Sequence, residues 1–352
     1  MLSSKENYLR NARFQGPEWI PSQVIINDAS WDQYQKDLEQ VCIRFPEFFP
    51  HVRPGWRDYN NYRFSPACRK NEPFIDAWGC RWETCQNGIE GVVTNIVLND
   101  WDKLEDFRVP DANEQFDRGL AQWDKIRNQI DEAKRFGEMT IGGVPHGFLF
   151  LRIIYLRGFE NAMIDFALDD PHIYRLIDML VDHNRVLVDK YLQMGVDVMQ
   201  FADDLGSQTS TFLSPAMFKK FIAPAYKKLI DPCKAQDVLV WLHSDGRTLD
   251  ILEEQVRVGV DIVNPQDLCN GIDNIARVVK GKACICLDID RQTIIPYGSP
   301  KDIEDLIREE VMKLGSSSGG LEFIAGIYPP TPPQNIEALC KALLKYRRYW
   351  WE

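Results

Sequence analysis

Two hydrophobic periodicities alternate along the chain from about residue 116 to the C-terminus. Stretches with apolar residues every three or four positions predict helices, and short, continuously apolar stretches between them predict strands buried on both faces. The predicted helices span residues 116–136, 172–194, 215–235, 249–258, 272–279, 300–314 and 335–349. The predicted strands span residues 139–144, 196–201, 238–242, 260–263, 283–287 and 321–324.

The junctions between these elements have the residues expected of βα units. Gly195-Val-Asp197 and Gly259-Val-Asp261 each stand where a helix ends and a strand begins, and Ser214 with Pro215 opens the helix at 215–235. Residues 19–26 supply an earlier strand. We therefore expect an α/β protein whose eight parallel strands close into a (β/α)8 TIM barrel. An open doubly wound sheet is the alternative, although no glycine-rich phosphate loop follows any strand.

The first 115 residues differ from the rest because they are rich in Trp, Arg, Asn and Pro and show few periodic stretches. Residues 51–63 contain three aromatic side chains, which indicates an ordered loop rather than a linker. We expect residues 1–115 to form an N-terminal aromatic-rich extension or cap with the first barrel strand and lid loops. Residues 116–352 would form the main part of the barrel, within one structural domain overall.

Composition narrows the class of protein. The 352 residues include 41 Lys and Arg against 52 Asp and Glu, a formal net charge of −11, which argues against nucleic acid and anionic membrane as partners. No apolar run approaches the ~20 residues of a membrane span, and the first residues have no apolar signal core. The nine cysteines are expected to be reduced thiols, so a cytoplasmic location is predicted.

In a barrel of this type, functional residues lie at the carboxyl ends of the strands. Polar and ionisable residues follow the predicted strands at these positions: Asn27, His146, Asp203, Asp204, His243, Asp245, Asn264, Gln266, Asp267, Asp288, Asp290 and Tyr328. We expect them to form a ring at one mouth, which would be the working site.

His243 and Asp245 are the sharpest pair in this ring. Two residues apart on an extended segment, they point to the same side, so an imidazole and a carboxylate can converge on one ion or one substrate group. The pair suits Zn²⁺ or a proton-transfer couple. The alternative is a hydrogen-bonded histidine at a strand end, with Asp245 capping the next helix.

Adjacent carboxylates need different roles because neighbouring side chains on a strand point to opposite faces. One of Asp203 and Asp204 is expected to face the mouth while the other binds backbone amides. Asp290, with Asp288, could supply a general acid or cap the next helix. The remaining Cys and His candidates are expected to be structural or without a role: Cys80, Cys85, Cys284, Cys286, His172 and His183.

Several stretches, taken in order, resemble the uroporphyrinogen decarboxylase superfamily, which contains porphyrinogen decarboxylases and corrinoid-linked methyltransferases. These stretches are residues 200–208, 213–224, 242–246, 287–290 and 326–338, with Asp76-Ala-Trp-Gly79 resembling a motif of uncharacterised branches. The resemblance covers about residues 135–350 well and the first hundred loosely. It implies an (α/β)8 barrel with its site at the carboxyl mouth.

This chain differs from the decarboxylases at the residues with which they bind the substrate carboxylates. Their Arg-Gln-Ala-Gly-Arg stretch is replaced by residues 25–30, which contain no arginine, and their Gly-His-Gly of the eighth strand by Ala325-Gly326. Without these basic groups, binding of a polycarboxylated tetrapyrrole is electrostatically unfavourable, so porphyrinogen decarboxylation is not expected.

The resemblance to the coenzyme M methyltransferases is also partial. Those enzymes hold zinc with a His-x-Cys pair and a later Cys, whereas this chain keeps His243 but has Asp245 and Ala325 in place of the cysteines. At these ligand positions, the chain is more similar to O-demethylases of the same superfamily, which bind zinc with varied sets of ligands. In that case His243 and Asp245 would bind the metal, with help from Asp203, Asp204 or Glu322.

The resemblance therefore implies an O-demethylase-type methyltransferase. It would move a methyl group from a small methoxylated or methylated donor to a corrinoid (methylcobalamin when loaded) on a partner protein, with acid or zinc assistance. The expected catalytic residues are His243, Asp245, Asp203 and Asp290. The expected substrate-binding residues are Asn27, Trp56, Tyr59, Trp78, His146, Asp204, Gln266 and Tyr328. The alternatives are a lyase or decarboxylase acting on a small acidic compound and a non-catalytic barrel that binds a small ligand.

Overall fold

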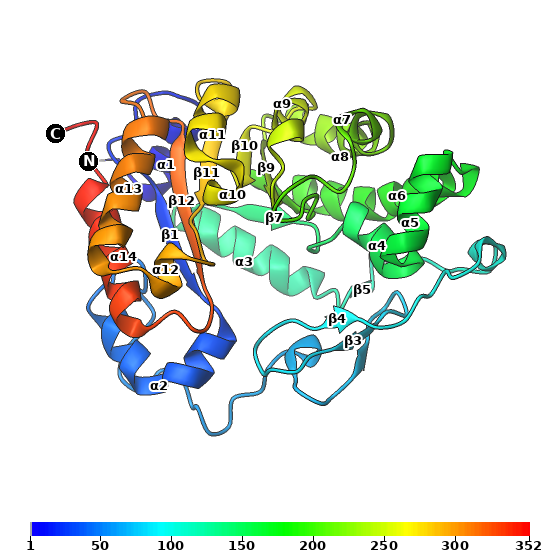
Figure 1. Ribbon diagram of the computed structural model, residues 1–352, viewed down its shortest axis with the longest axis horizontal. Coiled ribbons are helices and arrows are strands. Elements are labelled where there is room, and N and C mark those ends of the chain that lie inside the picture. The colour runs from blue at the N-terminus through cyan, green and yellow to red at the C-terminus, as the bar shows by residue number, and fades with distance from the viewer. Residues whose placement is uncertain (1) are drawn as a thin grey trace. The chain divides into compact units, whose positions relative to one another are not determined.

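The computed structural model describes residues 2–352 and divides into two compact units (Figure 1). The first unit comprises Met1–Pro73, Glu83–Val92 and Gln266–Glu352. The second unit comprises Phe74–Trp82 and Val93–Pro265. In each unit, short parallel strands alternate along the chain with helices.

The first unit contains three parallel strands in the order β1-β12-β11. These are β1 (Ser22–Ile26), β12 (Leu321–Ile327) and β11 (Cys284–Asp288). Its helices are α1 (Ser4–Ala12), α2 (Asp28–Ile43), α10 (Asp267–Asn270), α11 (Ile272–Val279), α12 (Ile294–Tyr297), α13 (Pro300–Leu314) and α14 (Pro333–Tyr346), with a 3-10 turn at Pro66–Cys68. α13 packs on α14, which packs on α2, as Figure 1 shows beside β12.

The second unit contains four parallel strands in the order β7-β8-β9-β10. They are β7 (Ile141–Gly143), β8 (Val198–Ala202), β9 (Leu239–Ser244) and β10 (Ile262–Pro265). The helices are α3 (Trp123–Arg135), α4 (Phe150–Arg157), α5 (Phe159–Leu168), α6 (Pro171–Gln193), α7 (Pro215–Met217), α8 (Ala223–Lys234) and α9 (Leu249–Arg257). The shorter elements are β2 (Phe74–Ile75), β5 (Gln115–Phe116), β6 (Gly119–Leu120) and a 3-10 turn at Trp101–Leu104. The division between the units falls within β3 (Arg81–Glu83) and β4 (Val92–Val93), since Glu83 and Val92 are assigned to the first unit.

The predicted α/β class is confirmed, because all seven strands predicted from the sequence are present and pair in parallel within their units. The strands are short, and every residue of β10 and β11 is buried. Within residues 2–352, an eighth parallel strand is not found, so a closed eight-stranded barrel stays a prediction. The N-terminal aromatic cap is likewise not confirmed.

Two helical predictions needed correction, and the sequence analysis did not predict α1, α2, α4 and α5. The helix expected from residue 116 begins at Trp123, because residues 115–120 form the antiparallel hairpin of β5 and β6. The helix expected at 215–235 contains a π-helical turn at Phe218–Ile222. In the first unit, α2 was missed although it buries Trp31, Leu38 and Val41 at helical spacing.

Many helices carry ion pairs on their exposed faces. These charged residues therefore lie at the surface, while the apolar faces of the same helices pack on the core. Lys227 with Asp231 on α8 and Lys301 with Asp305 on α13 are examples at i,i+4 spacing. Among residues 2–352, no helix combines the length and the apolar character that a membrane crossing requires.

A buried ionic cluster holds the start of the second unit together. The Arg152 guanidinium of α4 pairs with the carboxylates of Asp76, at 3.2 Å, and Asp117. Two indole N–H groups complete the cluster: Trp82 donates to Asp76 at 2.9 Å and Trp78 to Asp117 at 2.7 Å. Buried charges are tolerated only when they are paired in this way.

We predict that Arg152→Leu destabilises the protein by about 3–5 kcal/mol, because two buried carboxylates lose their counter-charge. The control is Arg185→Leu on α6, where arginine forms an exposed pair with Asp189; that change should cost about 1 kcal/mol or less. Urea unfolding followed by circular dichroism measures both. Equal losses in the two variants would show that the cluster does not stabilise the fold.

Candidate functional site

Three strand exits of the second unit bring four ionisable side chains together. The His243 Nε2 atom lies 3.0 Å from Asp245 Oδ1 and 3.7 Å from Asp204 Oδ1. His146, which follows β7, places its Nε2 atom 3.2 Å from the same Asp204 oxygen. Asp204 Oδ1 also accepts the backbone N–H of Asp245 at 3.1 Å. One carboxylate oxygen thus lies between two imidazoles.

The orientation of His243 is fixed from the neighbouring strand. Asn264 is opposite His243 in the β9–β10 register, is buried, and its Oδ1 atom lies 2.6 Å from His243 Nδ1. An amide oxygen at this position accepts the Nδ1–H, which directs Nε2 toward Asp245 and Asp204. The Trp241 ring, stacked at 6.1 Å between centroids, supports the imidazole from the same face of β9.

The two adjacent aspartates after β8 have separate roles, as the sequence predicted for such a pair. Asp203 is fully buried and accepts the backbone N–H groups of Phe150 and Leu151 at 2.6 and 2.8 Å and the Tyr226 hydroxyl at 2.9 Å. Burial raises the pKa of Asp203 to about 7, while these donors act in the opposite direction. Asp203 therefore anchors the start of α4, and Asp204 faces the histidines.

A cavity of about 560 Å³ opens beside this cluster. His146 lines it, together with Gln200 and Trp241, which face each other in the β8–β9 register. Its walls are otherwise largely apolar, including Phe201. Arg118 is the permanently cationic side chain in this lining, and its guanidinium lies 4.3 Å from the centre of the Trp82 ring. A small, weakly polar molecule suits such a cavity.

The cluster also fits a divalent metal. One ligand atom each from His146, Asp204 and His243 lie within 4.8 Å of one another. Two imidazoles and a carboxylate with an open fourth position are the donor set of many catalytic zinc sites. The Asn264 contact to Nδ1 adds the outer-shell hydrogen bond that such histidines need. Sequence analysis had named His243 and Asp204 among the candidate ligands, and the structure adds His146 to them.

Several predicted substrate-binding residues serve local structure. Asn27 caps α2 through the Ala29 N–H at 2.7 Å. The Tyr59 hydroxyl donates to Glu39 at 3.1 Å, and burial and Glu39 raise the pKa of Tyr59 to about 12. Trp78 is buried in the ionic cluster, so the structure places it in the packing and not in a lid.

The other residues predicted from strand ends lie in the first unit. Asp290 accepts from the backbone N–H and the hydroxyl of Thr293, both at 2.9 Å, and so caps the turn before α12, which was the alternative that the sequence left open. Gln266 is buried and immediately precedes α10. Tyr328 follows β12 and is partly exposed, with the Arg291 guanidinium 5.4 Å from its ring centre. Trp56 lines a separate cavity of this unit.

Glu322 lies at the amino end of β12, whereas functional strand exits are at the carboxyl ends. It is buried and accepts the Tyr8 hydroxyl of α1 at 3.2 Å. Burial raises the pKa of Glu322 to about 7. It is not in the sets of metal-ligating atoms found within the described residues.

Sequence analysis missed Gln200, Trp241 and Arg118 as cavity residues. A signal existed for two of them: Gln200 interrupts an apolar strand, and Trp241 lies two residues before His243, on the same face. The position of Arg118 depends on the β5–β6 hairpin, which the sequence pattern did not indicate.

The parallel βα architecture with polar strand exits defines an α/β fold of barrel-like type, and comparison with known proteins identifies its family. The family model for "Uroporphyrinogen decarboxylase (URO-D)" matches residues 75–346. The chain therefore belongs to the uroporphyrinogen decarboxylase family, which confirms the resemblance noted from its motifs.

The individual relatives are of two kinds, methyltransferases and decarboxylases. The methylcobamide:CoM methyltransferase MtbA of Methanosarcina mazei is 24% identical over 175 residues, 49% of each chain. A uroporphyrinogen decarboxylase of Prochlorococcus marinus (strain MIT 9211) is 30% identical over 179 residues, 50% of this chain and 49% of that protein. The chain thus matches about half the length of these curated relatives.

A solved structure has the same fold over nearly the whole chain. The methyltransferase from Methanosarcina mazei superimposes with a TM-score of 0.68 at 16% identity, covering 98% of this chain and 99% of that chain. At this identity, the match establishes the fold.

The raised pKa of Glu322 predicts a pH dependence of stability. Because the folded state binds the proton more tightly than the unfolded state, this group stabilises the fold most below about pH 4.5 and loses that contribution as pH rises to about 7. Glu322→Gln keeps an acceptor for Tyr8 and removes the ionisation. The variant should gain up to about 3 kcal/mol relative to wild type between pH 4.5 and 7.5.

Urea unfolding at a series of pH values measures this difference. The control is Glu309→Gln on α13, an exposed glutamate that forms an ion pair with Lys313, and its stability should follow that of wild type. A constant difference between Glu322→Gln and wild type across this range would contradict the prediction.

Proposed function

We propose that the protein is a methyltransferase that moves a methyl group from a small methoxylated or methylated compound to a corrinoid on a partner protein. The observation that carries the proposal is the cluster of His146, Asp204, His243 and Asp245 beside the 560 Å³ cavity. Similarity to the MtbA methyltransferase supports the reaction class. The proposal goes beyond the reaction class by naming the type of methyl donor, which would be that of an O-demethylase.

Breaking a bond between oxygen and a methyl group leaves an alkoxide or phenoxide, a poor leaving group unless its charge is neutralised. His243 can supply a proton to this oxygen. With Nδ1–H donated to Asn264, protonated His243 holds its second N–H at Nε2, on the side of Asp245. Transfer of that proton to the departing oxygen yields a neutral alcohol and neutral His243, while the methyl group goes to the cobalt(I) corrinoid. Asp245 stabilises the imidazolium before transfer.

Zinc offers the second way to stabilise this charge. His146, Asp204 and His243 would hold it, and when bound it would act as a Lewis acid toward the donor oxygen. The two routes use His243 Nε2 differently, as a proton donor or as a metal ligand, so metal content decides between them. Asp203 would act as a positioning residue in either case, because it holds α4 beside the exit of β8.

The charges around the cavity disfavour a polycarboxylate as the substrate. Arg118 is the permanently cationic residue in the lining, where the carboxylate of Asp117 is already paired with Arg152. The carboxylates of Asp204 and Asp245 lie nearby, in the histidine cluster. A polycarboxylate would meet repulsion, whereas a neutral methoxy compound would not. A small acid with one carboxylate could still pair with Arg118, and relatives named uroporphyrinogen decarboxylase keep this second candidate open.

We predict that the protein methylates a cobalt(I) corrinoid protein when supplied with a suitable donor from a panel of methoxylated and methylated compounds. His243→Ala should reduce the rate at least 100-fold, because both the acid and the metal-ligand roles are lost. Methylcobalamin absorbance measures the reaction. The matched control is His172→Ala, an exposed histidine that stacks on Trp101.

Two outcomes would contradict this proposal. The first is the absence of methyl transfer across the panel when the cognate corrinoid protein is present. The second is release of CO2 from a small acid without a corrinoid partner, which would identify a decarboxylase. Unchanged ligand binding and cellular phenotype in both His243→Ala and Asp245→Ala would favour a non-catalytic protein.

We also predict one tight Zn²⁺ site per chain. After dialysis against a chelator, calorimetric titration with ZnCl2 should show that His146→Ala and Asp204→Asn each weaken binding at least 10-fold. His172→Ala should bind as wild type does. Equal affinity in all four proteins would place any zinc elsewhere and would leave proton donation by His243 as the route.

A further inference from the structure

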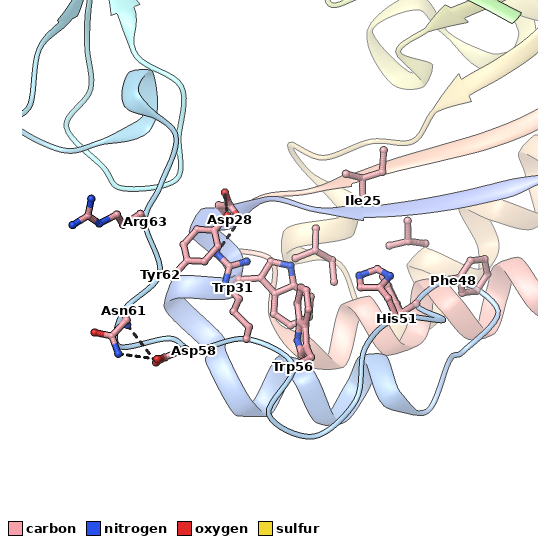
Figure 2. Close-up of a pocket in the computed structure, with 14 residues that line it drawn as sticks. Ile25, Asp28, Trp31, Phe48, His51, Trp56, Asp58, Asn61, Tyr62 and Arg63 are labelled. Carbon is pink, nitrogen blue, oxygen red and sulfur yellow. Dashed lines mark hydrogen bonds and ion pairs between the residues drawn. The ribbon is translucent and has the colours of Figure 1, made fainter. Parts of the chain in front are cut away.

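The first unit contains a larger cavity that the proposed methyl transfer does not use. It measures about 640 Å³ and is lined by β1, the start of α2 and the loop of residues 48–63. Figure 2 shows the rings of Trp31, Trp56 and His51 gathered on one side of β1, while Ile25 stands on the other side of the strand. The cavity is described entirely within this unit, so the inference does not rest on the proposed reaction.

The rings in this cavity are arranged for a flat guest. The Trp56 ring meets Trp31 edge-on at 5.1 Å between centroids, with an angle of 69° between the planes, and meets His51 at 5.2 Å and 72°. Phe48 and Phe49 extend the apolar wall. Aromatic groups favour such offset and edge-to-face contacts with another ring. A cavity of this volume accommodates a one- or two-ring compound.

The loop that supplies the rings of Trp56 and His51 is held in place by contacts to α2. Buried Glu39 of α2 accepts the Gly55 N–H at 3.0 Å and the Tyr59 hydroxyl at 3.1 Å. Asp28 accepts the Tyr62 hydroxyl at 3.0 Å, as the dashed line in Figure 2 shows. The walls of the cavity are therefore built before a ligand enters, which reduces the ordering cost of binding.

Two buried N–H groups in the lining, Trp56 Nε1 and Arg57 Nε, have no hydrogen-bond acceptor among residues 2–352. The Arg57 side chain is 6% exposed and its Nη2 atom pairs with Asp28 at 2.9 Å, while its guanidinium lies 3.5 Å from the Tyr62 ring centre. Within residues 2–352, its Nε atom is buried and has no hydrogen-bond acceptor. A buried N–H without an acceptor is unfavourable, and a ligand oxygen can satisfy it.

The charges of the lining select against ions. Asp28 offsets Arg57 directly, and the other charged residues of the lining, Asp58 and Arg63, are exposed. Figure 2 shows that Arg63 points away from the rings. A quaternary ammonium would suit the aromatic walls, but it carries no acceptor for the buried N–H groups. An uncharged acceptor fits both the rings and the free N–H groups.

We propose that this cavity binds a small, uncharged, planar aromatic compound that carries an oxygen acceptor. The ring packs among Trp31, Trp56 and His51, and the oxygen accepts the Nε–H of Arg57. Both parts are needed: the ring supplies apolar contact, and the oxygen supplies the hydrogen bond that the protein lacks.

Binding of acetophenone, ethylbenzene and tetramethylammonium to the full chain, followed by ligand-observed NMR, tests the proposal. Acetophenone has the ring and the oxygen, ethylbenzene has the ring alone, and tetramethylammonium has a positive charge alone. Wild type should bind acetophenone about 10-fold more tightly than ethylbenzene, and tetramethylammonium least. Equal affinity for the two ring compounds, or preference for the cation, would overturn it.

Two variants separate the parts of the site. Arg57→Lys keeps the positive charge beside Asp28 but removes the Nε–H, so it should lose the preference for acetophenone over ethylbenzene. Trp56→Leu should weaken both ring compounds. Arg44→Lys, which changes an exposed arginine paired with Glu337 in the same unit, is the matched control. If Arg57→Lys retains the wild-type preference while its melting temperature is unchanged, the assigned acceptor contact is wrong.

Discussion

The parallel register of β8, β9 and β10 determines the chemistry of the second unit. Because side chains alternate along a strand, the pairing of Ala202 with His243 and of His243 with Asn264 places these three residues in one row on one face. A slip of β10 by one residue would put Val263 or Pro265 opposite His243 and remove the acceptor for Nδ1. The direction of Nε2 toward Asp204 and Asp245 would then be lost. Burial of all four β10 residues opposes such a slip, because exposing them would cost apolar contact with the core.

The strand exits need a second constraint, since loops have few contacts of their own. Asp203 supplies it by accepting two backbone N–H groups at the start of α4, which ties the exit of β8 to the helix that follows β7. Farther along α4, Arg152 joins Asp76 and Asp117 in the buried ionic cluster. Asp117 and Arg118 are adjacent, so the same cluster positions the cationic residue of the cavity. Packing, backbone hydrogen bonds and cavity charge are therefore coupled through one helix.

Sequence pattern predicted the regular part of the chain well because buried parallel strands and amphipathic helices obey simple periodicities. The helices at 272–279 and 300–314 match α11 and α13 at both ends, and the strand-end rule found His146, Asp204 and His243. It could not find the role of Glu322, because its burial depends on α1, a helix with no clear apolar stripe, and on Tyr8 more than 300 positions away. Nor could it distinguish Trp56 in a cavity from Trp78 in an ionic cluster, since both are aromatic residues in a polar segment and only long-range contacts separate them.

The shared Asp204 oxygen sets a limit on what this site can do. Two imidazoles and two carboxylates this close together can be stabilised by protons on the histidines or by one divalent ion, but His243 Nε2 cannot hold a proton and a metal at the same time. With a metal on His146, Asp204 and His243, Asp245 becomes the remaining carboxylate beside it and can act only as an acceptor. Without a metal, Asp245 instead favours the protonated form of His243. For the proposed methyl transfer, the same four residues would therefore support Lewis-acid or proton-donor assistance to a leaving oxygen. In both states Asn264 performs the same task, because its contact is with the other ring nitrogen.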